Sequence, residues 1–278
     1  MTMTYDEIWH KIATVYDENE AKAIARYVLD VCFGMSATDV YCGKVTQLSA
    51  DDNCKLEKII QRIMKHEPVQ YITGTADFAG HTFDVGPSVL IPRPETAELC
   101  EWIIEDAASD PNVLDIGTGS GCIAITLALG IKTAKVNAWD ISPQALLTSA
   151  HNASKLGANV TFNCQDAIHY PNDNECWDII VSNPPYICDK EKTDMERNVL
   201  EYEPGLALFV PDDNPLIFYQ HISEYAIEAL KHEGMLYFEI NPIYHHEMID
   251  MLEKEGFCDI TIKEDSFGKK RFVKAKKL

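Results

Sequence analysis

Strand-like and helix-like segments alternate along residues 111–278, and this alternation constrains the fold more than any other feature of the sequence. The apolar, strand-like segments are 113–116, 135–139, 159–164, 177–182, 235–240, 258–262 and 271–274. The helix-like segments between them begin at Ser120 and cover 143–156, 215–231 and 243–255. Strands connected through helices form a mostly parallel sheet with helices on both faces. The sequence therefore predicts an α/β fold.

The first 94 residues follow two other patterns. Apolar residues recur every three or four positions across residues 5–70, which predicts a small bundle of amphipathic helices. Residues 71–94 form short alternating runs interrupted by glycine and proline, which predicts a β-hairpin linker. The expected division is a helical domain at 1–72, a hairpin linker at 73–92 and an α/β domain at 93–278.

The charge balance and the cysteines disfavour several classes of protein. Of the 278 residues 44 are acidic and 24 basic, and the resulting net charge of −20 opposes broad contact with phosphate backbones. Nine cysteines, an odd number without a Cys-x-x-Cys pair, argue against a disulfide framework and a zinc site. We therefore expect no metal, no nucleic-acid substrate and a reducing compartment.

The N-terminal region bears on location. It has no basic segment followed by an apolar one, and no stretch of the chain reaches the roughly 18 consecutive apolar residues that a membrane span requires. The sequence predicts a cytoplasmic protein without membrane contact.

A glycine-rich turn follows the first strand of the α/β region. The residues Asp115-Ile116-Gly117-Thr118-Gly119-Ser120-Gly121-Cys122 connect a strand to a helix, where backbone N–H groups can approach a ligand. A dinucleotide-binding turn would carry its third glycine at position 122, which is a cysteine here. A ligand without phosphate, lying against Gly117, Thr118, Gly119, Ser120 and Gly121, fits the spacing better.

Carboxylates are expected where successive parallel strands end. Asp140 follows the second strand and can accept hydrogen bonds from two ribose hydroxyls, and Asp166 follows the third strand and can reach an adenine amine. Together with Asp115 they describe a pocket for S-adenosylmethionine. Alternatively, Asp140 caps the following helix and Asp166 is an ordinary turn residue.

The sharpest motif is Asn183-Pro184-Pro185-Tyr186, directly after the apolar strand 177–182. The two prolines cannot continue a central strand, so the Asn183 and Pro184 carbonyls point into the site together with the Asn183 side-chain oxygen. These acceptors match a planar –NH2 group, and Tyr186 offers a face for stacking. The set is suited to methylating a conjugated nitrogen through positioning and charge stabilisation.

Six segments resemble the bacterial release-factor glutamine methyltransferases, the HemK/PrmC family, over essentially the whole chain. They are Glu67-Pro68-Val69-Gln70-Tyr71-Ile72-Thr73-Gly74, Val89-Leu90-Ile91-Pro92-Arg93-Pro94-Glu95-Thr96, Asp115–Gly121, Asn183–Tyr186, Tyr202-Glu203-Pro204 with Ala207-Leu208, and Phe267-Gly268-Lys269-Lys270-Arg271.

The resemblance implies a Rossmann-like, seven-stranded class I methyltransferase domain behind a helical domain that binds the release factor. It implies transfer of a methyl group from S-adenosylmethionine to N5 of the glutamine in the Gly-Gly-Gln motif, which modulates translation termination and leaves S-adenosylhomocysteine. Asn183, Pro184, Pro185 and Tyr186 would be catalytic, with Asn183 also touching the cofactor. A monomer is expected.

The chain departs from the family pattern at three places. Ala97, followed by Glu98, stands where the family usually has an acid, and residues 209–216 lack its usual glycines. Ala167 stands where the family often has a bulky residue against the adenine, so Ile168 or a neighbour would cover that face, with Ala167 among the residues that border the cofactor. Arg93 would neutralise the cofactor carboxylate, orient the linker, or form no more than a surface ion pair.

Two other functions remain open at this point. A nucleic-acid amino-methyltransferase shares the asparagine motif, but the acidic surface speaks against it. A module that only senses the cofactor would not need the intact Asn183–Tyr186 motif.

Overall fold

A seven-stranded sheet, in the order β10-β11-β9-β6-β3-β4-β5, organises the larger part of the computed structural model, which describes residues 2–278. Strands β3, β4, β5, β6 and β9 run parallel, whereas β11 is antiparallel to both of its neighbours. The strands are β3 (Asn112–Ile116), β4 (Lys135–Asp140), β5 (Val160–Cys164), β6 (Trp177–Ser182), β9 (Leu230–Glu239), β10 (Phe257–Glu264) and β11 (Lys270–Lys277).

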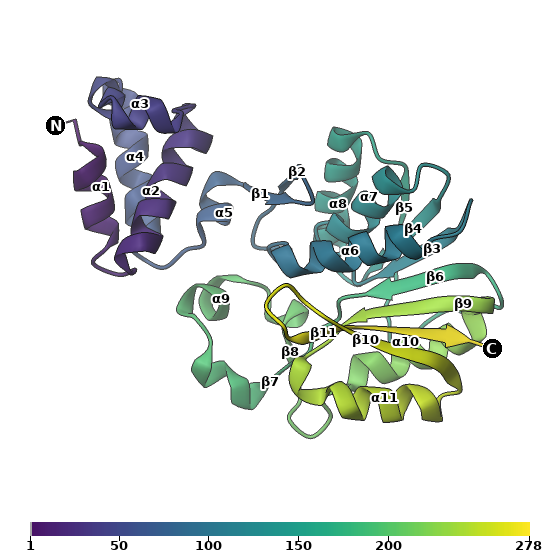
Figure 1. The fold of residues 1–278 in the computed structure, drawn as a ribbon. Helices are drawn as coiled ribbons and strands as arrows, with labels where there is room; N and C mark the ends of the chain where they lie inside the picture. The colour runs from purple at the N-terminus through teal and green to yellow at the C-terminus, as the bar shows by residue number, and fades with distance from the viewer. Residues whose placement is uncertain (1) are drawn as a thin grey trace. The chain divides into compact units, whose positions relative to one another are not determined.

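Alternate residues of these strands enter two separate cores. Leu114 and Ile180 pack with α10 and α11, whereas Val113 and Ile179 pack with α6, α7 and α8 on the opposite face. Figure 1 shows these two groups of helices on either side of the sheet. The helices are α6 (Pro94–Asp106), α7 (Cys122–Gly130), α8 (Pro143–Leu156), α10 (Ile217–Ala229) and α11 (His245–Lys254). The predicted α/β sheet with both faces covered is confirmed.

Both ends of α8 are capped by residues that favour these positions. The Ser142 hydroxyl accepts a hydrogen bond from the Ala145 N–H at the start of α8, and Pro143 occupies its first turn. Gly157 ends the same helix with φ +71°, a conformation that costs a glycine little.

The second compact unit is helical and has its own core of side chains such as Ile8, Leu29, Leu56 and Ile63. Its elements are α1 (Tyr5–Ile12), α2 (Glu18–Phe33), α3 (Ala37–Tyr41), η1 (Lys44–Gln47), α4 (Ala50–Ile63), α5 (Val69–Thr73) and α9 (Arg197–Tyr202).

The helical unit is discontinuous in sequence, because it combines residues up to Thr75 with residues 196–202. The Tyr202 hydroxyl donates a 2.9 Å hydrogen bond to the Lys65 carbonyl. Residues 196–202 thus belong with the helices, although we expected the whole of 93–278 in one domain.

The expected hairpin linker forms only in part and is not free. Strands β1 (Thr75–Phe78) and β2 (His81–Asp84) make the hairpin, whereas Tyr71-Ile72 lies in helix α5 and residues 89–91 form no strand. Phe78 and Phe83 enter the core with α6 and α7, and Asp84 contacts Asn152, His151 and Lys155 of α8. The hairpin is therefore part of the sheet unit, because its two phenylalanines need an apolar environment.

Short elements complete the sheet unit. They are β7 (Ile187–Cys188), η2 (Asp189–Asp194), η3 (Gly205–Ala207), β8 (Phe209–Val210) and η4 (Pro242–Tyr244). Within the described residues, no helix is both long and apolar enough to cross a membrane.

Candidate active site

The register of the parallel strands brings the predicted site residues to one level. Ile116 of β3 pairs with Trp139 of β4 and with Ser182 of β6. The residues that follow these three are Gly117, Asp140 and Asn183. Since neighbouring strands lie about 4.8 Å apart, these residues form a row at the carboxyl edge of the sheet.

The glycine-rich turn leaves open space at two positions. Gly117 and Gly119 have φ values of +77° and +55°, and a Cβ on either would meet no atom within 4 Å. Gly121 differs, since a Cβ there would lie 2.8 Å from the Ile125 side chain and 3.0 Å from that of Ser149. The first two glycines thus keep room in front of the turn, and the third allows α7 to pack closely against α8.

Asp115 braces this turn from below and is not exposed to a ligand. Its side chain is fully buried, and one carboxylate oxygen accepts hydrogen bonds from the Thr118 hydroxyl (2.6 Å) and the Ala124 N–H (3.2 Å). Burial raises the pKa of Asp115 to about 7, against the lowering effect of these two hydrogen bonds. Asp115 therefore supports the turn instead of contributing to the pocket.

The raised pKa of Asp115 predicts a loss of stability as the pH rises. Since the folded state binds this proton more tightly than the unfolded chain, the contribution is present at low pH and is lost between about pH 4 and pH 7. Asp115→Asn removes this titration. When the pH is raised from 5 to 8, we therefore expect the free energy of unfolding of the variant to rise by about 3 kcal/mol relative to that of the parent. Thermal unfolding of both proteins at the two pH values measures the gain. An identical pH dependence in both would contradict the assignment.

Asp140 holds the turn from the side. One oxygen of its carboxylate accepts the Gly119 N–H and the other the Ser142 N–H, both at 2.8 Å. Burial raises the pKa of Asp140, and the two N–H bonds oppose this rise. A carboxylate oxygen has a second lone pair, so each can still accept a hydroxyl proton.

Asp166 is engaged locally. Its carboxylate accepts the Ile168 N–H at 2.9 Å and lies 2.7 Å from His169 Nδ1, and these contacts lower its pKa. The neighbouring Gln165 N–H donates to the Asp140 carbonyl, so Asp166 lies beside the row of strand ends. Ala167 is partly buried and packs against the core that the sheet forms with α10 and α11.

The Asn183–Tyr186 motif begins at the end of β6, beside Gly117 in the row, and is tied to buried groups. Asn183 Nδ2 donates to the Thr96 hydroxyl (3.4 Å), and the Tyr186 hydroxyl donates to Glu239 (3.2 Å). Asn183 Oδ1 has no hydrogen-bond partner among the described residues. Pro184 and Pro185 end β6 and separate the two anchored side chains. The site thus offers a fixed, unused amide oxygen.

Comparison with known proteins identifies the family. Family models described as "Methyltransferase small domain" and "PrmC N-terminal domain" match residues 70–202 and 13–74. The chain is 48% identical to the release factor glutamine methyltransferase of Bacteroides thetaiotaomicron, covering 96% of this chain and 97% of that protein. It is 40% identical to the enzyme of the same name from Flavobacterium psychrophilum, over 95% and 94% of the two chains.

The chain belongs to the release factor glutamine methyltransferase family. A solved methyltransferase from Pyrococcus furiosus shares the fold, with a TM-score of 0.53 at 16% identity over 70% of this chain and 88% of that one.

Two residues of this methyltransferase site were not predicted from the sequence, Thr96 and Glu239. Thr96 lies in the first turn of α6 and Glu239 ends β9, and their side chains are 2.6 Å apart although 143 residues separate them. An acid at the end of the apolar run 235–238 was the available signal for Glu239.

Arg93 of the methyltransferase orients the segment that leads into α6. Its guanidinium lies 2.6 Å from a carboxylate oxygen of the buried Glu203, whose other oxygen accepts the Ile91 N–H. A second Arg93 nitrogen donates to the Ile91 carbonyl. Of the three roles considered for Arg93, these contacts favour holding the chain in place, and the buried Glu203 speaks against a mere surface ion pair.

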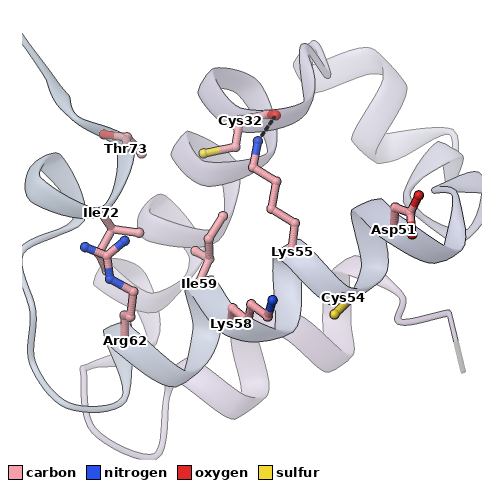
Figure 2. Close-up of a pocket in the computed structure, with 9 residues that line it drawn as sticks. All are labelled: Cys32, Asp51, Cys54, Lys55, Lys58, Ile59, Arg62, Ile72 and Thr73. Carbon is pink, nitrogen blue, oxygen red and sulfur yellow. Dashed lines mark hydrogen bonds between the residues drawn. The ribbon is translucent and has the colours of Figure 1, made fainter.

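The helical unit of the methyltransferase carries a pocket of about 480 Å³ between α2, α4 and α5. Figure 2 shows its lining residues, with the Lys55 ammonium pointing to the Cys32 carbonyl 3.3 Å away. Arg62 is paired with Glu67, and Lys58 forms no ion pair with any residue that the structure describes. The pocket combines apolar walls, such as Ile59, with the cations of Lys55 and Lys58 and one acid, Asp51, so its lining is positive overall.

Among the described residues, no group of three or more His, Cys, Asp or Glu side chains is placed to hold a metal ion.

Proposed function

We propose that this methyltransferase transfers the methyl group of S-adenosylmethionine to the N5 side-chain amide of the glutamine in the Gly-Gly-Gln motif of peptide-chain release factors. The observation that carries the proposal is the unused Asn183 Oδ1, held at the carboxyl edge of the sheet beside the open glycine turn. The proposed reaction modulates translation termination and takes place where translation occurs, in the cytoplasm.

The cofactor site is proposed at the glycine turn. The open space at Gly117 and Gly119 and the spare lone pairs of Asp140 fit a ligand with an uncharged ribose edge. Thr118, Ser120 and Gly121 shape the turn. Asp166 and Ala167 would lie by the adenine. Because the Asp166 carboxylate is already bound by Ile168 and His169, Asp166 is a weaker candidate for cofactor binding than Asp140. When bound, S-adenosylmethionine supplies an electrophilic methyl group, and S-adenosylhomocysteine is released.

The protein's own contribution is to orient the acceptor nitrogen. The lone pair of an amide nitrogen is delocalised, so an acceptor for its N–H groups raises reactivity by alignment. Asn183 Oδ1 and the carbonyls of Asn183 and Pro184 would accept the two N–H groups, while Pro185 and Tyr186 shape the wall. These oxygen dipoles also stabilise positive charge that develops on the nitrogen.

The helical unit is proposed to bind the release factor. Its pocket presents the Lys58 ammonium beside apolar walls, which suits an acidic side chain next to an apolar one. The net charge of −20 disfavours nucleic acid as the substrate. Since one chain supplies Gly117, Asp140 and Asn183, we propose that a monomer is sufficient.

Removing Asp140 is expected to weaken cofactor binding. Asp140→Ala loses a charged acceptor for ribose hydroxyls, worth roughly 1.5–3 kcal/mol, which corresponds to a Kd about ten- to a hundredfold higher. Isothermal titration calorimetry with S-adenosylmethionine measures the change, and a thermal unfolding curve confirms that the variant is folded. An unchanged Kd in the folded variant would place the ribose elsewhere.

The proposed function is tested with labelled methyl donor under single-turnover conditions. Intact release factor, an isolated Gly-Gly-Gln peptide, duplex DNA and ribosomal RNA are the four substrates. We expect label on the release factor, much less on the peptide, and mass spectrometry of tryptic fragments should place the methyl group on the glutamine. Equal or faster labelling of a nucleic acid would replace the proposal with a nucleic-acid amino-methyltransferase.

A further inference from the structure

Glu239 lies at the same level of the sheet as Asn183, one strand away. Ser182 of β6 pairs with Phe238 of β9, so the next residues on the two strands are Asn183 and Glu239. Glu239 is buried, with 1% of its surface exposed. Burying a carboxyl group is costly unless hydrogen bonds compensate for the lost water.

The two Glu239 oxygens are bound by Thr96 and by Tyr186, the last residue of the active-site motif. The Thr96 hydroxyl donates to Oε2 at 2.6 Å, and the Tyr186 hydroxyl donates to Oε1 at 3.2 Å. Thr96 in turn accepts from Asn183 Nδ2. Glu239 is thus connected directly to Tyr186 and through one hydroxyl to Asn183.

The direction of these hydrogen bonds fixes the orientation of the Asn183 amide. A hydroxyl has a single proton, and that of Thr96 is committed to Glu239. The Thr96 oxygen can therefore only accept from Asn183, so the NH2 end of the amide faces Thr96. The opposite end, Oδ1, is then presented as an acceptor.

The groups around Glu239 affect its pKa, and so whether its oxygens accept or donate hydrogen bonds. Burial raises its pKa, while the Thr96 hydroxyl, the Arg271 guanidinium and the Tyr186 hydroxyl lower it, and Glu95 opposes them. Arg271 is itself held by Asp265 at 2.7 Å. Burial outweighs these groups, so the pKa of Glu239 is raised overall. In the ionised form the carboxylate accepts both hydroxyl protons and donates none.

We propose that Glu239 is a positioning residue. It orients Asn183 indirectly, through the Thr96 hydroxyl, and it orients Tyr186 by direct contact, so that the Asn183 oxygen faces the acceptor nitrogen. The inference rests on the proposed function only in the identity of that nitrogen. Glu239→Gln keeps the shape but brings an NH2 group, which can donate to the Thr96 oxygen. The Thr96 proton is then free to bind Asn183 Oδ1, and the amide loses its orientation.

The first experiment measures the orientation without any substrate. In protein labelled with 15N-asparagine, Asn183→Ala identifies the side-chain NH2 resonance of Asn183. We expect Glu239→Gln and Thr96→Val to shift this resonance, and Thr96→Ser to leave it nearly in place because the hydroxyl is retained. Tyr219→Phe is the matched control, since the buried Tyr219 hydroxyl donates to the backbone carbonyl of Glu239 and not to its side chain.

The second experiment measures single-turnover methyl transfer to intact release factor. We expect Glu239→Gln and Thr96→Val each to lower the rate about ten- to a hundredfold, with cofactor and release-factor affinities within about threefold of the parent. The double variant should be no slower than the slower single one, because both break the same connection. Thr96→Ser should restore most of the rate.

Each outcome is decisive for one of the two proposals. An Asn183 resonance unchanged by Glu239→Gln, or additive losses in the double variant, would overturn the positioning role. If Glu239→Gln does not fold, Thr96→Val and Thr96→Ser carry the same comparison. If the resonances shift as expected while the parent methylates no release factor, the positioning role stands and the proposed function is wrong.

Discussion

Asn183→Ala is expected to lower the rate of methyl transfer by about 10²–10³-fold, because it deletes the side-chain oxygen proposed to hold the acceptor nitrogen at the end of β6. The affinity for the release factor should change little, since the helical unit is untouched. Single-turnover kinetics with labelled donor give the rate, and equilibrium binding of the release factor gives the affinity.

Asn183→Asp is the informative companion variant. It keeps an oxygen on each side but cannot donate to Thr96, so its orientation is no longer fixed. We expect a rate between those of the parent and the alanine variant. A turnover near that of the parent in Asn183→Ala would remove this residue from the mechanism.

Replacing the glutamine of the Gly-Gly-Gln motif by glutamate in the release factor is expected to abolish methyl transfer. The proposed acceptor set requires two N–H donors on one planar group, and an ionised glutamate has none. It would also bring a negative charge to the Asn183 oxygen. Mass spectrometry of the motif peptide after prolonged incubation is the measurement.

The glycines of the motif provide a graded control for the same experiment. They let the backbone approach the site and adopt dihedral angles closed to other residues. Replacing one by alanine in the release factor should slow transfer while leaving the glutamine intact. Labelling of the glutamate variant at that position would contradict the proposed acceptor chemistry.

The sheet was predictable because its signals are local. Each parallel strand is a short apolar run with a helix after it, and the caps Ser142 and Gly157 mark α8 at the predicted residues. The glycine turn and Asn183 were found for the same reason, as contiguous motifs next to strands. The register then brings them into one row.

The parts that escaped prediction depend on distant contacts. Thr96 and Glu239 meet only because α6 packs on the sheet at the end of β9. Asp115 was grouped with the ligand carboxylates, since the sequence does not reveal that its side chain points beneath the turn. Tyr71-Ile72 reads as a strand on its own, but Pro68 and Gly74 bound a short helix there.

The discontinuity of the helical unit has a consequence for synthesis and for engineering. During translation the first 75 residues leave the ribosome long before residues 196–202, and Tyr202 lies 137 residues after its partner Lys65. The nascent bundle therefore waits for its last helix until most of the sheet unit has been made. An exchange of this unit between relatives has to transfer residues 1–75 and 196–202 as a pair.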